Sequence, residues 1–540
     1  MDHKSERDKD VKAIRDSPHP RKAVVAGPGT GKSYLFSEVL KKKRAEGKTK
    51  FLAITFIGKL GDALAHDLCG LAETTTMHGF ARKFVLDCCG RGWTYYPKMH
   101  EIIQEDLKAD RIKCEIADKN YAEKTKHYKS VGDADVIHYA VQICKKDPDK
   151  IPVYDLVLID EYQDFNEIES EFVDFLAKKN EIIIVGDDDQ TLYVFKGSSP
   201  SFIRKKYDSK NTDFERHTLR FCSRCTEVVI EYFHALVARY NLNDPAKGRI
   251  QKEYVCYVPD KVADSEANPK IHLITNCPPG MIASKIKYEL KELVEIQKIK
   301  DVLVVGEART CRALLGTIAM QLVNSGFRYV DHRHDETLLH INQKIVDAYK
   351  FIQKDNPLLG WRILGDPNDE AERAKHLKNA ETLTKIISGT PSKLKTISNK
   401  AISDLEAEIQ EWEPQDGEAD AETIRRKQNS EVRKNNLFKE LKLSNLHLPR
   451  PLCNIEITVC NILNSKGLGA DVIFLVGFDQ GKFPAKKEAT DSEVYQMLVA
   501  LTRAKKRIYL VTTIDKKVSS FIDCLDSEKL EVDEIKLKQK

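Results

Sequence analysis

Short, uninterrupted apolar runs recur in the N-terminal part of the chain, and each ends in a turn rich in glycine or acidic residues. The runs occupy residues 23–25, 51–56, 156–159 and 182–185. Apolar runs of this length, bounded by turn residues, predict strands buried on both faces, as in a parallel sheet. The chain between them carries helix-compatible patterns. We therefore expect an open α/β sheet whose functional groups lie where the strands end.

The turn after the first run ends in Gly-Lys-Ser. Its residues are Ala26, Gly27, Pro28, Gly29, Thr30, Gly31, Lys32 and Ser33, and Tyr34 opens a helix-compatible stretch. A strand, a glycine-rich turn and a helix start in this order predict a phosphate-binding loop. Glycines let backbone N–H groups approach the phosphates, Lys32 can reach the β- and γ-phosphates, and the Ser33 hydroxyl can hold Mg²⁺. The loop alone predicts only that a nucleotide binds.

The second run ends with an aromatic and a basic residue, Phe56 and Lys59. At the carboxyl end of a parallel strand, such a pair suits a stacked base and a phosphate contact. A packed phenylalanine beside a solvated lysine fits the same pattern, so both interpretations stay open on these residues alone.

The third run ends in two adjacent carboxylates, Asp160 and Glu161. A nucleotide hydrolase needs one carboxylate to hold Mg²⁺ and a second to orient and deprotonate the attacking water. Paired acids at a strand end also occur as helix caps. With a phosphate-binding loop upstream, we interpret Asp160 as the metal ligand and Glu161 as the base.

The fourth run leads into three consecutive aspartates and Gln190. A neutral glutamine beside a γ-phosphate can report whether that phosphate is present. Tyr193 and Phe195 follow closely, and their rings can stack on bases. The aspartates at 187–189 cannot all be packed in a core without partners.

Composition adds bounds to this picture. The chain has 540 residues, enough for two to four domains, and its formal net charge of +4 neither requires nor excludes a nucleic-acid partner. Thirteen cysteines without an apolar N-terminal segment favour a reducing, cytoplasmic setting, and no apolar run is long enough to cross a bilayer. Cys222 and Cys225 have zinc-knuckle spacing, but no second pair stands nearby to complete four ligands.

Further motifs follow the same order as those of a known family. They are Thr55-Phe56, Thr76-Met77-His78, Leu219 with Arg224, Asn464 to Leu468 and Val499 to Lys505. Together with the phosphate-binding loop and the acidic turns, they make the chain resemble UvrD/Rep-type superfamily 1 helicases over nearly its whole length.

The resemblance implies an α/β fold with two RecA-like P-loop NTPase domains, each built on a parallel sheet and carrying a mainly helical insertion. It places the first motor domain at 1–87 and 152–215, its insertion at 88–151, the second motor domain at 216–335 and 452–540, and a short, charged insertion at 336–451.

By resemblance, ATP and Mg²⁺ bind between the motor domains, and Arg224 and Arg503 act as arginine fingers on the γ-phosphate. Hydrolysis would then move the protein 3′ to 5′ along single-stranded DNA, or along DNA with a 3′ single-stranded tail. The predicted strand contacts are Phe56, Lys59, His78, Tyr193, Phe195 and Asn464.

Several positions depart from the family pattern, and Asp10, Ser223 and Gly469 stand where the family recognises the base and the sugar. The departures are Asp10 for a glutamine, Lys196 for an arginine, Ser223 for an aromatic, Leu463 for a histidine and Gly469 for an acid. We therefore expect weaker nucleotide affinity and a looser preference for ATP, unless Tyr34 or Phe221 supplies the missing stack.

Two rival functions remain. One is a DNA-dependent ATPase subunit that senses DNA ends or strands and regulates a separate nuclease in a defence or repair complex, and the short second insertion favours it. The other is an ATP-binding structural subunit without turnover. The retained set of Lys32, Asp160, Glu161, Gln190, Arg224 and Arg503 counts against it.

Overall fold

The described residues of the computed structural model form two compact units. These residues are 3–332, apart from 57, 69, 110, 114, 209–212, 326 and 328; then 347–364, 374, 377, 378, 380, 381 and 455–536. The first unit takes its residues from Met1–Ala81, Ala140–Arg333 and Leu446–Lys540, and the second from Arg82–Tyr139 and His334–Asn445. The expected insertion at 336–451 therefore lies mostly outside the described residues.

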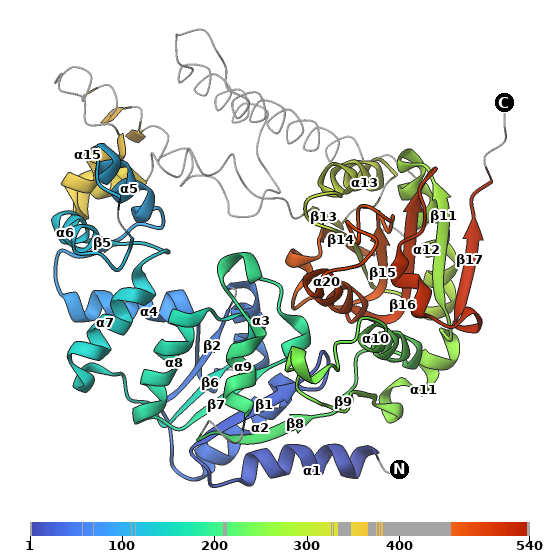
Figure 1. Ribbon diagram of the computed structural model, residues 1–540, viewed down its shortest axis with the longest axis horizontal. Helices are drawn as coiled ribbons and strands as arrows, with labels where there is room; N and C mark the ends of the chain where they lie inside the picture. Colours follow the sequence, from blue (N-terminus) through green and yellow to red (C-terminus); the bar gives the residue numbers. More distant parts are fainter. Residues whose placement is uncertain are drawn as a thin grey trace. The chain divides into compact units, whose positions relative to one another are not determined.

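The first unit contains two α/β domains, which Figure 1 shows as two separate sheets. The N-terminal sheet has six parallel strands in the order β3-β2-β6-β7-β1-β8. Its strands are β1 (Arg21–Ala26), β2 (Phe51–Thr55), β3 (Glu73–Thr76), β6 (Leu156–Ile159), β7 (Ile182–Gly186) and β8 (Glu215–Leu219). The four apolar runs form β2, β6, β7 and the centre of β1, as predicted.

Helices surround this sheet. They are α1 (His3–Asp16), α2 (Lys32–Ala45), α3 (Gly58–Leu68), α4 (Met77–Cys89), α7 (Val136–Lys146), α8 (Glu167–Lys179) and α9 (Pro200–Tyr207). Apolar side chains of α1, α2 and α3 pack with those of the strands in one core. Since every pair of strands is parallel, the strand ends that carry the predicted site residues meet at one edge of the sheet.

The C-terminal sheet has seven parallel strands in the order β13-β14-β12-β15-β16-β11-β17. They are β11 (Ile271–Cys277), β12 (Asp301–Gly306), β13 (Tyr329–His332), β14 (Glu456–Asn461), β15 (Ala470–Val476), β16 (Ala504–Thr513) and β17 (Leu530–Glu534). The helices are α10 (Glu227–Arg239), α11 (Val258–Ala267), α12 (Ile282–Gln297), α13 (Arg312–Asn324) and α20 (Asp491–Leu501). A two-stranded parallel pair, β9 (Phe221–Cys222) and β10 (Val255–Cys256), lies beside them.

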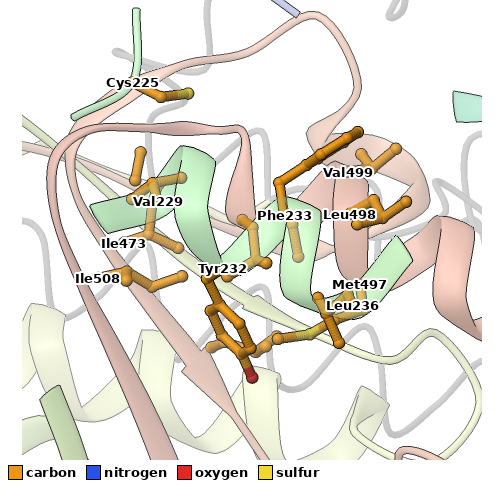
Figure 2. Packing of buried hydrophobic residues seen from close by; sticks show 14 of the residues in the cluster. Cys225, Val229, Tyr232, Phe233, Leu236, Ile473, Met497, Leu498, Val499 and Ile508 are labelled. Carbon is orange, nitrogen blue, oxygen red and sulfur yellow. The ribbon is translucent and has the colours of Figure 1, made fainter. Parts of the chain in front are cut away.

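Alternation along the C-terminal strands divides its core into two layers. On β15, Phe474 packs in the layer that includes α12 and α13, while Ile473 packs in the layer that includes α10 and α20. Successive strand side chains point to opposite faces, so a wholly apolar strand serves both layers. Figure 2 shows Val229, Tyr232 and Leu236 of α10 in this second layer, together with Leu498 of α20. This packing fixes the end of α20 at Leu501, two residues before Arg503.

The second unit joins residues from both expected insertions. It contains β4 (Thr94–Tyr95), α5 (Met99–Ala109), α6 (Lys119–Tyr128), β5 (Ser130–Val131), a π-helix at Phe351–Asp355 and α15 (Pro357–Leu364). One apolar core takes side chains from both segments, including Tyr96 and Phe351. The side-chain amide of Asn356 donates to Thr94 Oγ1 at 3.1 Å, and Arg362 Nε donates to Asp106 Oδ1 at 2.9 Å.

Among the described residues, no helix combines the length and the apolar character that a bilayer span requires.

Candidate active site

The loop between β1 and α2 has the backbone that its glycines allow. Gly29 has φ +70° and Gly31 has φ +88°, a region that residues with a side chain rarely adopt. The Thr30 hydroxyl closes the turn by donating to the carbonyl of Gly27 at 2.8 Å. Ala26 is buried at the end of β1, and Lys32 and Ser33 begin α2.

Lys32 and the acidic pair after β6 meet at the edge of the sheet. Lys32 Nζ lies 2.9 Å from Glu161 Oε1, and Gln163 Nε2 donates to Glu161 Oε2 at 2.7 Å. Burial opposes ionisation of Glu161, but the charges of Lys32 and Lys466 outweigh it and hold the pKa of this carboxyl well below its usual range. Burial and the neighbouring Glu161 charge raise the pKa of Asp160 to about 6, although Lys32 opposes that shift.

Lys466, which the sequence places in the family-like motif of Asn464 without indicating a role, comes from the C-terminal domain to the same carboxylates. Its ammonium group donates to Asp164 Oδ2, donates to the carbonyl of Gln190 at 3.1 Å, and lies 3.5 Å from Glu161 Oε2. The side chain is only 1% exposed. A buried lysine needs such partners. Its place in that motif is the one sequence signal that could have identified it.

Gln190 and Arg503 also meet across the two domains. Arg503 Nη2 lies 3.2 Å from Gln190 Oε1, while Arg503 Nε donates to the carbonyl of Val499 at 3.0 Å. Burial and the nearby charge of Arg224 lower the pKa of Arg503 to about 10. Gln190 Nε2 donates to Asp187 Oδ2 at 2.7 Å, so both ends of this amide are engaged.

The three aspartates after β7 are fully buried, and cations surround them. Each has at least one ion-pair partner among Arg204, Arg249 and Lys252. The aspartate oxygens are close enough together to hold a metal ion. However, the Lys252 ammonium group already lies within 2.9 Å of all three side chains. The sequence implied that partners exist but did not identify them.

Residues of the C-terminal domain pack on the phosphate-binding loop. The Ser223 N–H donates to the carbonyl of Gly29 at 2.9 Å, and the Tyr254 hydroxyl donates to the carbonyl of Pro28 at 2.8 Å. A Cβ at Gly29 would lie 2.4 Å from Cβ of Arg224, and one at Gly27 would lie 2.7 Å from the Tyr254 ring. These glycines are therefore needed for contact between the domains as well as for the turn.

Cys222 and Cys225, the cysteine pair beside Arg224, supply two of the four ligands that a structural zinc site needs. Cys222 and Cys225 are buried, and the Cys225 N–H donates to Cys222 Sγ at 3.4 Å. Within the described ranges, no group of three or more metal-ligating side chains gathers around this pair.

The positions at which the family recognises the base and the sugar carry other residues in this chain. Arg220 donates two hydrogen bonds to the carboxylate of Asp10, at 3.0 and 3.1 Å. Tyr34 is 47% exposed, with the Arg7 guanidinium 5.8 Å from its ring centre, whereas Phe221 is buried. Gly469 lies next to Arg224, since a Cβ there would be 3.4 Å from Arg224 Nε.

Three of the predicted strand contacts form a cluster of rings. The ring centres of Phe56 and Tyr193 are 4.9 Å apart, and those of Tyr193 and Phe195 are 6.0 Å apart. Phe195 is 69% exposed, but Tyr193 is buried and its hydroxyl donates to the carbonyl of Leu463 at 3.4 Å. Within this cluster, Phe195 presents the largely exposed ring.

The remaining predicted strand contacts are His78, Asn464 and Lys59. His78 is half-buried on α4, with Nδ1 3.8 Å from Glu169 Oε1. Asn464 is exposed, and its N–H donates to Asn461 Oδ1 at 2.8 Å. Lys59 belongs to α3, and its side chain lies outside the described residues.

The donor set at the loop fits a magnesium nucleotide. A hydroxyl and a carboxylate, from Ser33 and Asp160, are the hard oxygen ligands that Mg²⁺ prefers. Asp160 is buried beside Glu161, and burial raises the pKa of its carboxyl, so a divalent cation bound there would favour the ionised form.

Comparisons with known proteins agree with this geometry. The model of the UvrD/REP helicase N-terminal domain matches residues 93–211, and that of the UvrD-like helicase C-terminal domain matches residues 341–515. Together they cover more than half of the chain.

Curated relatives match over shorter segments. An ATP-dependent helicase/nuclease subunit of Lactococcus lactis subsp. cremoris (strain SK11) is 29% identical over 30% of this chain and 14% of its own length. The exonuclease/helicase subunit RexA of strain MG1363 is 30% identical over 17% of this chain and 8% of its own length. A putative ATP-dependent DNA helicase of Bacillus subtilis (strain 168), YjcD, is 31% identical over 17% and 13%. The matches thus span only a small part of each relative. With both family models matched, the chain belongs to the UvrD-like family of ATP-dependent helicases.

Proposed function

We propose that this protein is a motor that hydrolyses ATP, with Mg²⁺, and moves 3′ to 5′ along single-stranded DNA. One observation carries the proposal: side chains of the C-terminal domain reach the predicted catalytic groups of the N-terminal domain. Arg503 contacts Gln190. Lys466 donates to Asp164, and its ammonium group lies 3.5 Å from Glu161 Oε2. Any change in the distance between the domains must therefore change the groups around the γ-phosphate.

The residues on the N-terminal side prepare the water and the phosphates. Lys32 would leave Glu161 for the triphosphate, whose charge is larger. Its departure removes one cause of the low pKa of Glu161, so this carboxylate becomes a stronger base for the attacking water. Ser33 and Asp160 would hold Mg²⁺, which neutralises phosphate charge when bound.

The residues on the C-terminal side respond to the charge that develops during transfer. Arg503 and Arg224 are planar cations suited to phosphate oxygens, and both lie against groups of the N-terminal domain. Their removal from the phosphates when the domains separate would stop hydrolysis. ATP turnover and domain closure are coupled in this arrangement.

The aromatic cluster connects the strand to the same machinery. Tyr193 donates to the carbonyl of Leu463, three residues before Lys466. A strand stacked on Phe195 would press on Tyr193 and thus on the segment that carries Lys466. This contact supports stimulation of hydrolysis by DNA.

A second candidate is an ATPase subunit that regulates a separate nuclease. The observation in its favour is that similar bacterial proteins are named helicase/nuclease and exonuclease/helicase subunits. Such a subunit would hydrolyse ATP on DNA but displace strands poorly without its partner.

The first experiment measures hydrolysis of ATP, GTP and CTP by the full chain, with and without single-stranded DNA, and with Glu161→Gln as the control. The motor requires strong stimulation by DNA that Glu161→Gln abolishes. Displacement of a fluorescent strand from duplexes with 3′ or 5′ tails then tests direction. Stimulated hydrolysis without displacement would favour the regulatory subunit, and no hydrolysis of any nucleotide would reject both.

A further inference from the structure

One segment of the C-terminal domain is fixed to the N-terminal domain at two places. Arg249 donates from Nε and Nη2 to the two carboxylate oxygens of Asp189, each at 2.7 Å. Further along the chain, Tyr254 donates to the carbonyl of Pro28 in the phosphate-binding loop. Residues 249–254 therefore run from the acidic turn after β7 to the loop after β1.

Lys252 lies in the middle of this segment and inside the acidic turn. Its Nζ is 2.5 Å from Asp187 Oδ1, 2.6 Å from Asp188 Oδ1 and 2.9 Å from Asp189 Oδ2. The lysine side chain is 3% exposed and the three carboxylates are fully buried. Burial alone would lower the pKa of Lys252, but the three carboxylates outweigh it and raise that pKa, so the ammonium group stays charged.

Asp187 transmits this contact to the predicted phosphate sensor. Its Oδ1 accepts from Lys252, and its Oδ2 accepts from Gln190 Nε2 at 2.7 Å. The opposite end of the Gln190 amide accepts from Arg503 at 3.2 Å. Because an amide nitrogen carries two hydrogens, the bond to Asp187 fixes the orientation of Gln190 and leaves one N–H for a phosphate oxygen.

We propose that Lys252 is a positioning residue for the γ-phosphate contact: it holds Asp187, and Asp187 orients Gln190. The inference rests on the proposed function. Lys252 also neutralises a carboxylate that would otherwise repel a triphosphate next to Gln190. Contact with the third phosphate thus depends on a cation from the other domain that never touches it.

The alternative is that Lys252 only stabilises the fold by neutralising buried carboxylates. Arg204 offers a matched control, because its Nε pairs with Asp188 at 2.9 Å on the same acidic turn without an ion pair to Asp187. A purely structural role predicts similar effects of Arg204→Gln and Lys252→Gln. A positioning role predicts an effect on the γ-phosphate for Lys252→Gln alone.

The experiment measures the affinity of the full chain for a non-hydrolysable imido analogue of ATP and for ADP, both with Mg²⁺, by calorimetric titration. The preference for the triphosphate should fall about tenfold in Lys252→Gln, the loss expected for one charge-assisted hydrogen bond. Gln190→Ala should lose the same preference, and the double variant should lose no more than Gln190→Ala. Arg204→Gln should keep it.

Independent, multiplying losses in the double variant would overturn the proposal, as would an unchanged preference in Lys252→Gln. If Lys252→Gln does not fold, as judged by circular dichroism, the isosteric Asp187→Asn must show the tenfold loss instead, and retention there overturns the proposal. A wild-type chain that binds neither nucleotide rejects the proposed function as well. A wild-type preference that survives in every variant rejects only the positioning role.

Discussion

The phosphate side and the base side of the phosphate-binding loop are built in opposite ways. On the phosphate side, Lys32, Lys466 and Arg503 are buried or nearly buried, and each has a carboxylate, amide or carbonyl partner. On the base side, Asp10 is already paired with Arg220, and the Tyr34 ring is half exposed. We expect substitutions in the buried, charge-compensated network to lower activity strongly. The exposed ring on the base side imposes few restrictions on which base can bind.

This difference indicates which side of the loop can select one nucleoside triphosphate over another. Interactions with phosphates are common to all nucleoside triphosphates, so a strong phosphate side gives affinity and turnover without choosing the base. We therefore expect the protein to use GTP and CTP as well as ATP, because the base side offers few contacts that distinguish the bases. Substitutions on either side of the loop test this contrast.

The largest effect is expected on the phosphate side. Arg503→Ala should lower ATP turnover by about three orders of magnitude or more, because a cation on the transferring phosphate is lost. Steady-state hydrolysis with single-stranded DNA measures it. The control Asp10→Ala, on the base side, should change turnover only a few-fold at saturating ATP. Equal losses in the two variants would remove the contrast.

The predicted strand track has one feature in common with the base side, a largely exposed ring, that of Phe195. Phe195→Ala should weaken binding of single-stranded DNA by about 1–3 kcal/mol, the usual contribution of one stacked base. Fluorescence anisotropy with a labelled oligonucleotide measures it, and Lys205→Ala on α9 serves as a surface control. An unchanged affinity would assign Phe195 to a role other than stacking.

Glu169 is a buried carboxylate whose charge is compensated less than that of Glu161, because Lys196 offsets its burial only in part and His78 Nδ1 lies 3.8 Å away. Burial raises the pKa of Glu169 to about 7, although the N–H of Asn166 donates to it. The folded protein then holds a proton that the unfolded chain releases near its ordinary pKa, so Glu169 costs stability as the pH rises through this interval. Glu169→Gln, which keeps the cap of α8, should gain about 1–3 kcal/mol relative to wild type between pH 4.5 and pH 8.

Urea unfolding at several pH values measures this difference. The variant should equal the wild type at low pH and exceed it at high pH. A gain that is the same at every pH would show that Glu169 has the same pKa in the folded and the unfolded protein.

The smallest effect is expected in the second unit. Arg362 pairs with Asp106 but remains 32% exposed. Arg362→Leu should change the free energy of unfolding by no more than about 1 kcal/mol, because a partly exposed ion pair contributes little. Thermal melting measures it, with ATP turnover expected to stay unchanged.

The sequence predicted the sheets better than the site. Apolar runs identified β1, β2, β6 and β7 because a strand buried on both faces has a local signature. The parallel sheet then brings Lys32 and Glu161 together without further information. The turn after the fourth apolar run indicated Gln190 and the family pattern supplied Arg503, and the two side chains meet.

The partners of the aspartates could not be found in this way. Lys252 is more than 60 residues from Asp187, and Lys466 is about 300 residues from Asp164. No local pattern distinguishes Lys252 from the many solvated lysines in this chain, and the family-like motif marks Lys466 without naming its partner. Three buried carboxylates need neutralising cations, so the sequence predicts that such partners exist. Which cations they are depends on how distant segments pack in the fold. Tyr254 was missed for the same reason.

The cations around Asp187, Asp188 and Asp189 also affect whether the N-terminal domain can fold on its own. Lys252 and Arg249 belong to the C-terminal domain, so a chain cut after β8 would leave most of this acidic turn uncompensated in its interior. Such a fragment would carry a complete phosphate-binding loop. It would lack Lys252 and Arg249, the cations that neutralise the aspartates after β7. The N-terminal domain therefore depends on cations of the C-terminal domain to neutralise its own interior.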